Sequence, residues 1–220
     1  MSEYVCVDGI TYHIIHASKS ATVTEIDNME IVKIPYEIFD CTVTKIEANA
    51  CGNRTKVKHV VIPSDVRIIG DAAFYGCKKL TSVEIHSSNI NLNAFAFAKC
   101  SSLTTFSAYS IQLQGRDVFY GCSKIQRFTT VNQPIDSVFV GQLPIGTFYG
   151  CKKLKRLCVL NADIDNTAFF GCADLNTIQF HGSVKMTPDI KSFVRKRIIE
   201  CKEDSVLTDL VFGGTTVVII

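Results

Sequence analysis

The side chains best suited to nucleophilic or metal chemistry are ten cysteines and five histidines. One pair of them, Cys158 and His181, falls at outward positions of two neighbouring expected strands. His181 lies two residues further along its strand, so we expect the pair not to meet. No residues mark an oxyanion hole or an acid–base pair, and the G-x-G-x-x-G, G-x-S-x-G and H-E-x-x-H motifs are absent from the sequence. The sequence therefore predicts a protein that is not an enzyme.

Cysteine spacing also argues against metal chemistry. The sequence contains no C-x-x-C pair and no matched histidine pair, so we expect no metal site and no cofactor. Five cysteines instead occupy one position of a repeated phrase: Cys77, Cys100, Cys122, Cys151 and Cys172. Parallel side chains one strand apart keep their β-carbons wider than the roughly 3.5–4.5 Å of a disulfide. We predict a ladder of reduced, buried thiols packed as small hydrophobes, which favours a reducing compartment.

Cys158 does not belong to that column. It falls between Leu157 and Val159, at the outward position of its expected strand. We therefore predict that its side chain is partly exposed and that it is the most reactive thiol of the protein.

The phrase that carries the cysteines is the strongest signal in the chain. It reads Phe74-x-x-Cys77-x-x-Leu80-x-x-Val83-x-Ile85 and returns four times further on, with a degenerate earlier copy in which Cys51 and Arg54 take the Phe and Cys places. The intervals between Cys-column positions from Arg54 to Cys172 are 23, 23, 22, 29 and 21 residues. The longest interval reflects an insertion near residues 131–140. Such units bury their apolar face only by stacking, which predicts a solenoid.

Two stretches resemble the BspA-like leucine-rich repeats: Ile62 to Phe74 and Cys77 to Ile85. The N-terminal stretch around Asp8-Gly9 is similar to that family's entry cap. The resemblance covers roughly residues 7–182, although the Ile-Pro step is kept only at Ile34-Pro35 and Ile62-Pro63. It implies an α/β solenoid, a right-handed leucine-rich-repeat coil stack with a strand-rich concave face. It also implies a protein-interaction role of the adhesion or surface-recognition type.

We therefore expect one domain over residues 1–220. Residues 1–40 form an N-terminal cap with a hairpin turn at Asp8-Gly9, residues 41–182 form six repeats, and residues 183–220 form a C-terminal cap. In that last cap, Thr187-Pro188-Asp189 predicts a helix to about Lys196. Three strands should follow, at residues 198–201, 206–212 and 215–220, with the last two joined at Gly213-Gly214.

Composition limits the partners and the location. The formal net charge of +2 argues against nucleic acid as the main partner. No targeting segment or membrane-spanning run is visible, so we expect no membrane insertion. A cytoplasmic location is favoured, with a cell-surface location by a non-classical route as the alternative. We expect a monomer or a weak oligomer.

The concave surface is the expected binding site. The repeat phase predicts one outward column of Ile31, His59, Ser82, Thr105, Arg127, Arg156 and Thr177, and a second of Lys33, Val61, Glu84, Ser107, Thr129, Cys158 and Gln179. Tyr and Arg often carry interface energy, which makes Arg127, Arg156 and Tyr109 the best anchors. The candidate partner-binding residues are Arg127, Arg156, Tyr109, Glu84, His86, Cys158 and His181. The insertion at residues 133–139 is an alternative site. Two functions remain open, a surface-recognition module and an intracellular scaffold or adaptor.

Overall fold

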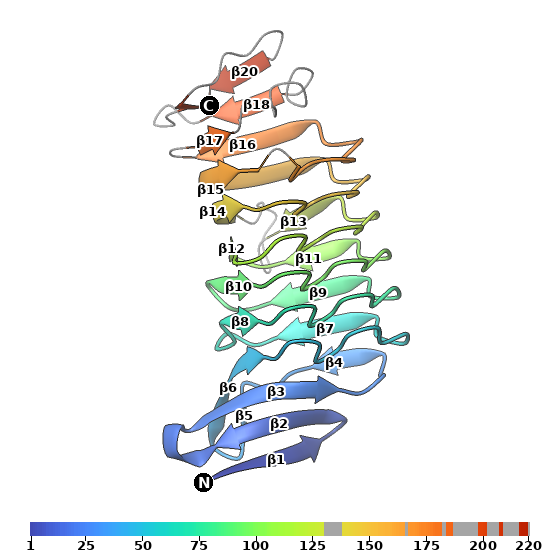
Figure 1. Ribbon diagram of the computed structural model, residues 1–220, viewed down its shortest axis with the longest axis vertical. Coiled ribbons are helices and arrows are strands. Elements are labelled where there is room, and N and C mark those ends of the chain that lie inside the picture. The colour runs from blue at the N-terminus through green and yellow to red at the C-terminus, as the bar shows by residue number, and fades with distance from the viewer. Residues whose placement is uncertain are drawn as a thin grey trace.

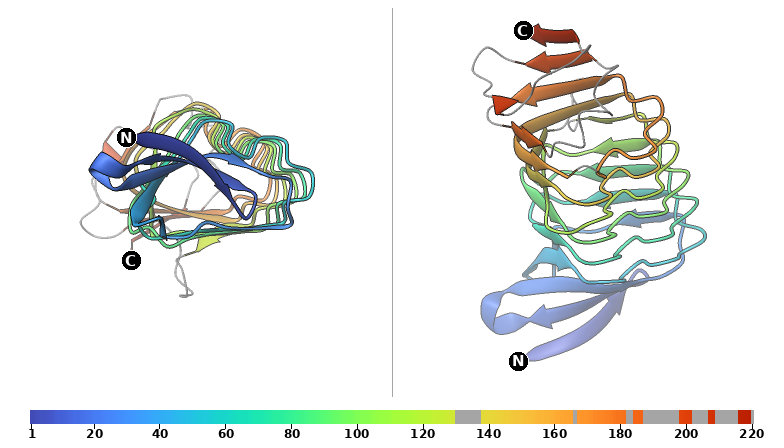
Figure 2. Two further views of the ribbon diagram at one scale, coloured as in Figure 1. Left: turned by 90° about the horizontal axis from the view of Figure 1, so that it is seen from below. Right: turned by 45° about the horizontal axis from the view of Figure 1, so that its top comes forward.

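The computed structural model describes residues 1–129, 138–165, 167–181, 184–186, 198–201, 207–208 and 216–219. The chain winds into a stack of coils with its two ends at opposite ends of the stack (Figure 1). Viewed along the stack, successive coils lie over one another (Figure 2). The predicted leucine-rich-repeat solenoid is confirmed.

An antiparallel hairpin opens the stack. Strands β1 (Ser2–Val7) and β2 (Ile10–Ile15) pair along their whole length, and Asp8 and Gly9 form the predicted turn with φ of 49° and 75°. A 3₁₀ turn, η1 (His16–Ser18), leads into β3 (Ser20–Ile26), which pairs antiparallel with β2 and parallel with β6. The hairpin therefore forms the N-terminal edge of a sheet, and the parallel pairing of that sheet begins between β3 and β6.

Most coils then contribute one strand to each of two parallel sheets. The short sheet contains β4 (Ile31–Lys33), β7 (His59–Ile62), β9 (Ser82–Ile85), β11 (Thr105–Ser107) and β13 (Arg127–Thr129). The long sheet continues from β3 through β6 (Cys41–Ile46), β8 (Ile68–Ile69), β10 (Ile90–Leu92), β12 (Ser110–Leu113), β14 (Val138–Leu143), β15 (Arg156–Ile164) and β16 (Thr177–His181), with the short β5 (Glu37–Ile38) paired to β6.

The third leg of each coil, which carries the Phe-x-x-Cys phrase, is a run of turns. Its backbone N–H groups bond across to the next coil, as from Phe74 to the Ala96 oxygen (2.8 Å) and from Gly76 to the Ala98 oxygen (2.8 Å). The second residue after each core phenylalanine has positive φ, from 60° to 78° at Gly76, Lys99, Gly121, Gly150 and Gly171. A left-handed residue in every coil prevents an α-helix. The helical part of the expected α/β class is accordingly minor: among the described residues, η1 is the only helix.

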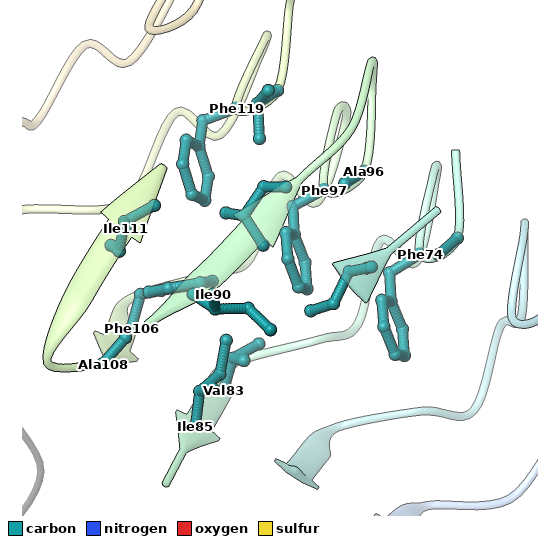
Figure 3. Packing of buried hydrophobic residues seen from close by; sticks show 14 of the residues in the cluster. Phe74, Val83, Ile85, Ile90, Ala96, Phe97, Phe106, Ala108, Ile111 and Phe119 are labelled. Carbon is teal, nitrogen blue, oxygen red and sulfur yellow. The ribbon is translucent and has the colours of Figure 1, made fainter. Parts of the chain in front are cut away.

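Stacked phenylalanines run through the core. Rings of successive coils lie almost parallel, with centroid distances of 5.1 Å for Phe74–Phe97, 5.9 Å for Phe97–Phe119 and 5.8 Å for Phe119–Phe148. Figure 3 shows the first three of these rings side by side, facing the strand residues Val83 and Phe106. One side-chain type at one phase of the repeat thus builds a continuous apolar interior.

The C-terminal end differs from the prediction. Strands β18 (Ile198–Cys201) and β20 (Thr216–Ile219) pair parallel and extend the long sheet beyond β16. Strand β19 (Leu207–Thr208) pairs parallel with β17 (Val184–Met186). The expected pairing of the last two strands with each other is therefore wrong: among the described residues, β19 pairs with β17 and β20 pairs with β18. The predicted helix from Thr187 to about Lys196 and the Gly213-Gly214 turn lie outside the described residues.

Candidate interaction surface

The outer face of the short sheet carries the predicted columns. Parallel pairing places side by side Ile31, His59, Ser82, Thr105 and Arg127, and in the next column Lys33, Val61, Glu84, Ser107 and Thr129. The residues between them, such as Val83 and Phe106, are buried. The strand register expected from the repeat phase is therefore confirmed in these five coils.

The first column continues across the insertion. The Lys155 N–H donates to the Gln126 oxygen at 2.8 Å, so Arg127 and Arg156 occupy successive rungs of the stack. Arg156 is in turn paired with Thr177 on β16. Both arginine side chains are exposed. The prediction that the two guanidinium groups belong to adjacent coils holds, even though β15 is paired with β14 in the long sheet. Residues 133–139, the alternative site, lie outside the described residues except for 138 and 139.

A shallow hollow of about 350 Å³ lies beside the first arginine. Its lining is polar: Thr104, Thr105, Gln126, Arg127 and Thr129. Tyr109, which is 43% exposed, follows β11 where the chain leaves the short sheet. The hollow and Arg127 combine a recess with a charged hydrogen-bond donor, which are two features that a charge-assisted contact uses.

Other polar side chains on the face pair with each other. His86 Nε2 lies 3.0 Å from Glu84 Oε1, and His59 Nδ1 lies 2.7 Å from Ser82 Oγ. Ser107 Oγ lies 2.8 Å from Thr129 Oγ1. A partner would have to break these contacts to use the same atoms.

Cys158 contradicts its prediction. Its exposed fraction is 5%, so it is a buried residue and not a partly exposed one on the face. The repeat phase placed it beside Thr129, but its partner on that side is Val138, the first residue of β14. Strand β14 therefore lies beside Cys158 and interrupts the second outward column at this coil. Cys158 should therefore not be the most reactive thiol, since a buried thiol is inaccessible to reagents.

The strand register does not place Cys158 opposite His181. Cys158 pairs with Gln179, and His181 pairs with Leu160 two residues further along. This is the offset that the sequence predicted. The side chain of His181 lies outside the described part of the structure.

The five column cysteines have a role that spacing did not reveal. Each is buried, and each S–H donates to the backbone oxygen at the Phe position of the preceding coil. The Sγ to O distances are 3.0 Å for Cys77–Cys51, 3.2 Å for Cys100–Phe74, 3.1 Å for Cys122–Phe97, 3.2 Å for Cys151–Phe119 and 3.1 Å for Cys172–Phe148. A valine or alanine at these positions could not donate such a bond. The thiols therefore form hydrogen bonds between successive coils as well as filling the core.

Thiol reactivity should follow this burial. Burial raises the pKa of Cys122 to about 12 and raises the pKa of Cys100 well above its ordinary value. Only the thiolate attacks iodoacetamide, so these residues should stay unmodified in the folded protein at pH 8. Cys6, which is exposed on β1, should be modified first. Mass spectrometry after brief labelling checks this, with labelling in urea as the control; early modification of Cys122 would contradict it.

Two further findings concern sites of other kinds. Among the described residues, no group of three or more His, Cys, Asp or Glu side chains is placed to hold a metal ion. The same part of the chain contains no helix that is both long and apolar enough to span a bilayer.

Comparison with known proteins identifies the repeat. The family model of the BspA type leucine rich repeat region, in six copies, matches residues 44–141 and 113–196. No protein with a curated description matches the chain. A leucine rich repeat protein of T. pallidum has a crystal structure with 23% identity and a TM-score of 0.57, over 79% of this chain and 91% of that one.

Two further solved structures are similar over parts of the chain. A leucine-rich repeat protein from Bacteroides capillosus has 29% identity and a TM-score of 0.44, over 47% of this chain and 80% of its own. A leucine rich cell surface protein from Faecalibacterium prausnitzii has 15% identity and a TM-score of 0.46, over 84% and 73%. The T. pallidum structure supports the shared fold.

Proposed function

Because the chain belongs to the BspA-type leucine-rich repeat family, whose repeats generally form protein-interaction modules, we propose that it binds a protein partner through the outer face of its short sheet. The observation that carries the proposal is that Arg127 lines a hollow of about 350 Å³ and that Arg156 occupies the same column on the next coil. The backbone hydrogen bond from Lys155 to Gln126 holds the two coils at a fixed spacing, and one arginine extends from each coil. Fixed spacing lowers the ordering cost of a two-point contact.

The charge of this region indicates the partner's chemistry. Lys155 precedes Arg156, and both are exposed, as are Gln126 and Arg127 on the preceding coil. Within the described part of the chain, Arg127 forms no ion pair. Guanidinium groups bind carboxylates through two parallel hydrogen bonds. The proposed partner therefore presents an acidic patch, with Tyr109 in contact at the margin.

The test is affinity capture from an extract of the source cells with the wild-type protein and an Arg127→Glu/Arg156→Glu variant. We expect the variant to lose the captured partner, because two attractive contacts become repulsive. The matched control is Lys78→Glu/Lys152→Glu, which makes the same charge change at exposed corner residues of the turn leg. Equal capture by wild type and the arginine variant would refute the surface. Loss in both variants would indicate a dependence on net charge alone and would refute it as well.

The setting of this interaction is a separate proposal. Surface recognition is what the family resemblance implies, and a scaffold role inside the cell is favoured by the thiols of the cysteine column, which suit a reducing compartment. Fractionation with surface labelling of intact cells distinguishes the two. Retention of all the protein in the cytosol would rule out surface recognition, and labelling of intact cells would rule out the scaffold.

A further inference from the structure

Two cysteines lie together where the first coil departs from the repeat. Cys51 occupies the place that a phenylalanine fills in the later coils, and Cys77 is the column cysteine of the next coil. Both side chains are fully buried, and Cys77 Sγ lies 3.0 Å from the Cys51 carbonyl oxygen. The other four column cysteines make the same bond to a residue whose side chain is a phenylalanine ring. Cys77 is therefore the column cysteine that has a second thiol at this place.

The two thiols interact directly. A hydrogen bond with the Cys51 thiol lowers the pKa of Cys77, and the N–H group and positive charge of Arg54 act in the same direction, against the effect of burial. The same hydrogen bond, together with burial, raises the pKa of Cys51. Arg54 is held in place by its bonds to the Ile26 oxygen (2.7 Å) and to Glu25 Oε1 (2.9 Å). Cys77 is therefore the member of the pair that more readily forms a thiolate, which is the form that reacts with oxidants.

A surface hollow lies beside the backbone that covers this pair. Its volume is about 350 Å³, and its lining consists of Asn53, Thr55, Gly76, Lys78 and Lys79. Gly76 immediately precedes Cys77, and Asn53 is two residues after Cys51. A small solute in the hollow therefore reaches the two turns that carry the thiols. Access to the sulfur atoms themselves needs a local opening of these turns, and the smallest opening suffices for a small uncharged oxidant.

We propose that Cys51 and Cys77 are an oxidation site, at which a hydroperoxide converts the two thiols into a disulfide between the first coil and the second. The Cys77 thiolate attacks one oxygen of hydrogen peroxide and becomes a sulfenic acid, and the departing hydroxide takes up the proton that the thiol released. The Cys51 sulfur then attacks the sulfenic sulfur, and a second water leaves as the S–S bond forms. Two thiols and one peroxide thus give one disulfide and two waters.

The disulfide replaces a weak link between the coils by a covalent one. Oxidation removes the S–H group that donates to the Cys51 oxygen and joins two residues that are 26 positions apart in the chain. A crosslink of this kind restricts the unfolded chain and so favours the folded state. The urea midpoint of the oxidised protein should therefore be higher than that of the reduced protein. This site is independent of the arginine surface on the short sheet.

The test is treatment of the folded protein with hydrogen peroxide, followed by blocking of the remaining thiols with N-ethylmaleimide in urea and digestion with trypsin. Trypsin releases residues 46–54 and 68–78, which carry Cys51 and Cys77. We expect these two peptides to be joined, with a mass lower than their sum by two hydrogen atoms, and to separate in dithiothreitol. Joining of Cys77 to Cys100, or recovery of the two peptides unjoined once the exposed cysteine of β1 has been oxidised, would overturn the assignment.

Two serine variants provide the second arm. Cys51→Ser removes the thiol that completes the disulfide, so its urea midpoint should not rise after peroxide treatment as that of the wild type does. Cys100→Ser is the matched control, because it removes a buried column thiol that donates to the Phe74 oxygen, where no second thiol is present. It should keep both the joined peptides and the rise in midpoint. An equal rise in Cys51→Ser would refute the site, and if that variant does not fold, the peptides of the wild type decide.

Discussion

Replacing Phe119 with alanine should lower the free energy of unfolding by about 3–5 kcal/mol, the range for removing a buried aromatic ring. Phe119 is fully buried at the centre of the core. Its ring lies 4.9–6.3 Å, centroid to centroid, from the rings of Phe97, Phe106, Phe128, Phe139 and Phe148. The cavity would lie between the stacked rings of Phe97 and Phe148. The neighbouring coils could not fill it without breaking their own stacking contacts.

The loss should also reduce cooperativity. In a solenoid each coil is stabilised mainly by its two neighbours. Weakening the contacts of one central coil separates the coils before it from those after it. We expect the Phe119→Ala variant to unfold in urea with a lower slope as well as a lower midpoint, measured by circular dichroism.

The matched control has the same chemistry at a different depth. Phe170 follows the core residue Phe169 and is 60% exposed. Its replacement by alanine should cost less than about 1 kcal/mol, because it removes a surface stacking contact without making a cavity. Similar losses in the two variants would show that the stacked core does not hold the coils together.

The core could be predicted because its signal repeats. A phenylalanine and a cysteine recur at a fixed phase in five copies. Because the coils stack in register, a position that is buried in one coil is buried in the others. The register of the short sheet follows from the same phase, because a one-residue slip would turn every buried strand residue outward. Arg127 and Arg156 were placed correctly on neighbouring coils for this reason.

The sequence-based predictions fail where an insertion interrupts the repeat phase and where backbone geometry determines the local conformation. Cys158 follows the insertion, and the strand that pairs with it begins at Val138 and not at the residue the repeat indicated. The turns of the third leg depend on positive φ at residues such as Lys99, which is not visible in a hydrophobic pattern. The bonds from the cysteine thiols to backbone oxygens depend on the offset between coils, which sequence spacing does not give.

We expect the buried thiols to make the protein sensitive to alkaline pH. Burial raises the pKa of Cys122 to about 12, and it raises the pKa of Cys100 and Cys151 well above the ordinary value. The folded state therefore holds these protons more tightly than the unfolded chain, in which a cysteine titrates near pH 8.5. The stability that this difference provides is complete below about pH 8.5, and it falls as the pH rises towards 12.

The expected loss is large. Each thiol that deprotonates only on unfolding contributes a decline of about 1.4 kcal/mol per pH unit. Cys122 alone would contribute on the order of 4 kcal/mol between its ordinary pKa and about 12. We expect the urea midpoint, followed by circular dichroism, to stay level from pH 7 to 8.5 and to fall steeply by pH 10.5. Tyr12, whose pKa burial also raises to about 12, adds a decline of the same sign above pH 10.

Two serine variants separate the thiols from general alkaline unfolding. Cys122→Ser keeps a donor for the Phe97 oxygen but has no group that titrates in this range. It should be less stable than wild type at pH 7 and should lose stability less steeply between pH 8.5 and 10.5. Cys6→Ser changes an exposed thiol and should leave the pH dependence as it is. A Cys122→Ser curve parallel to wild type would mean that the thiolate of Cys122 is no more costly in the core than in water. The alkaline loss of stability would then come from groups other than Cys122.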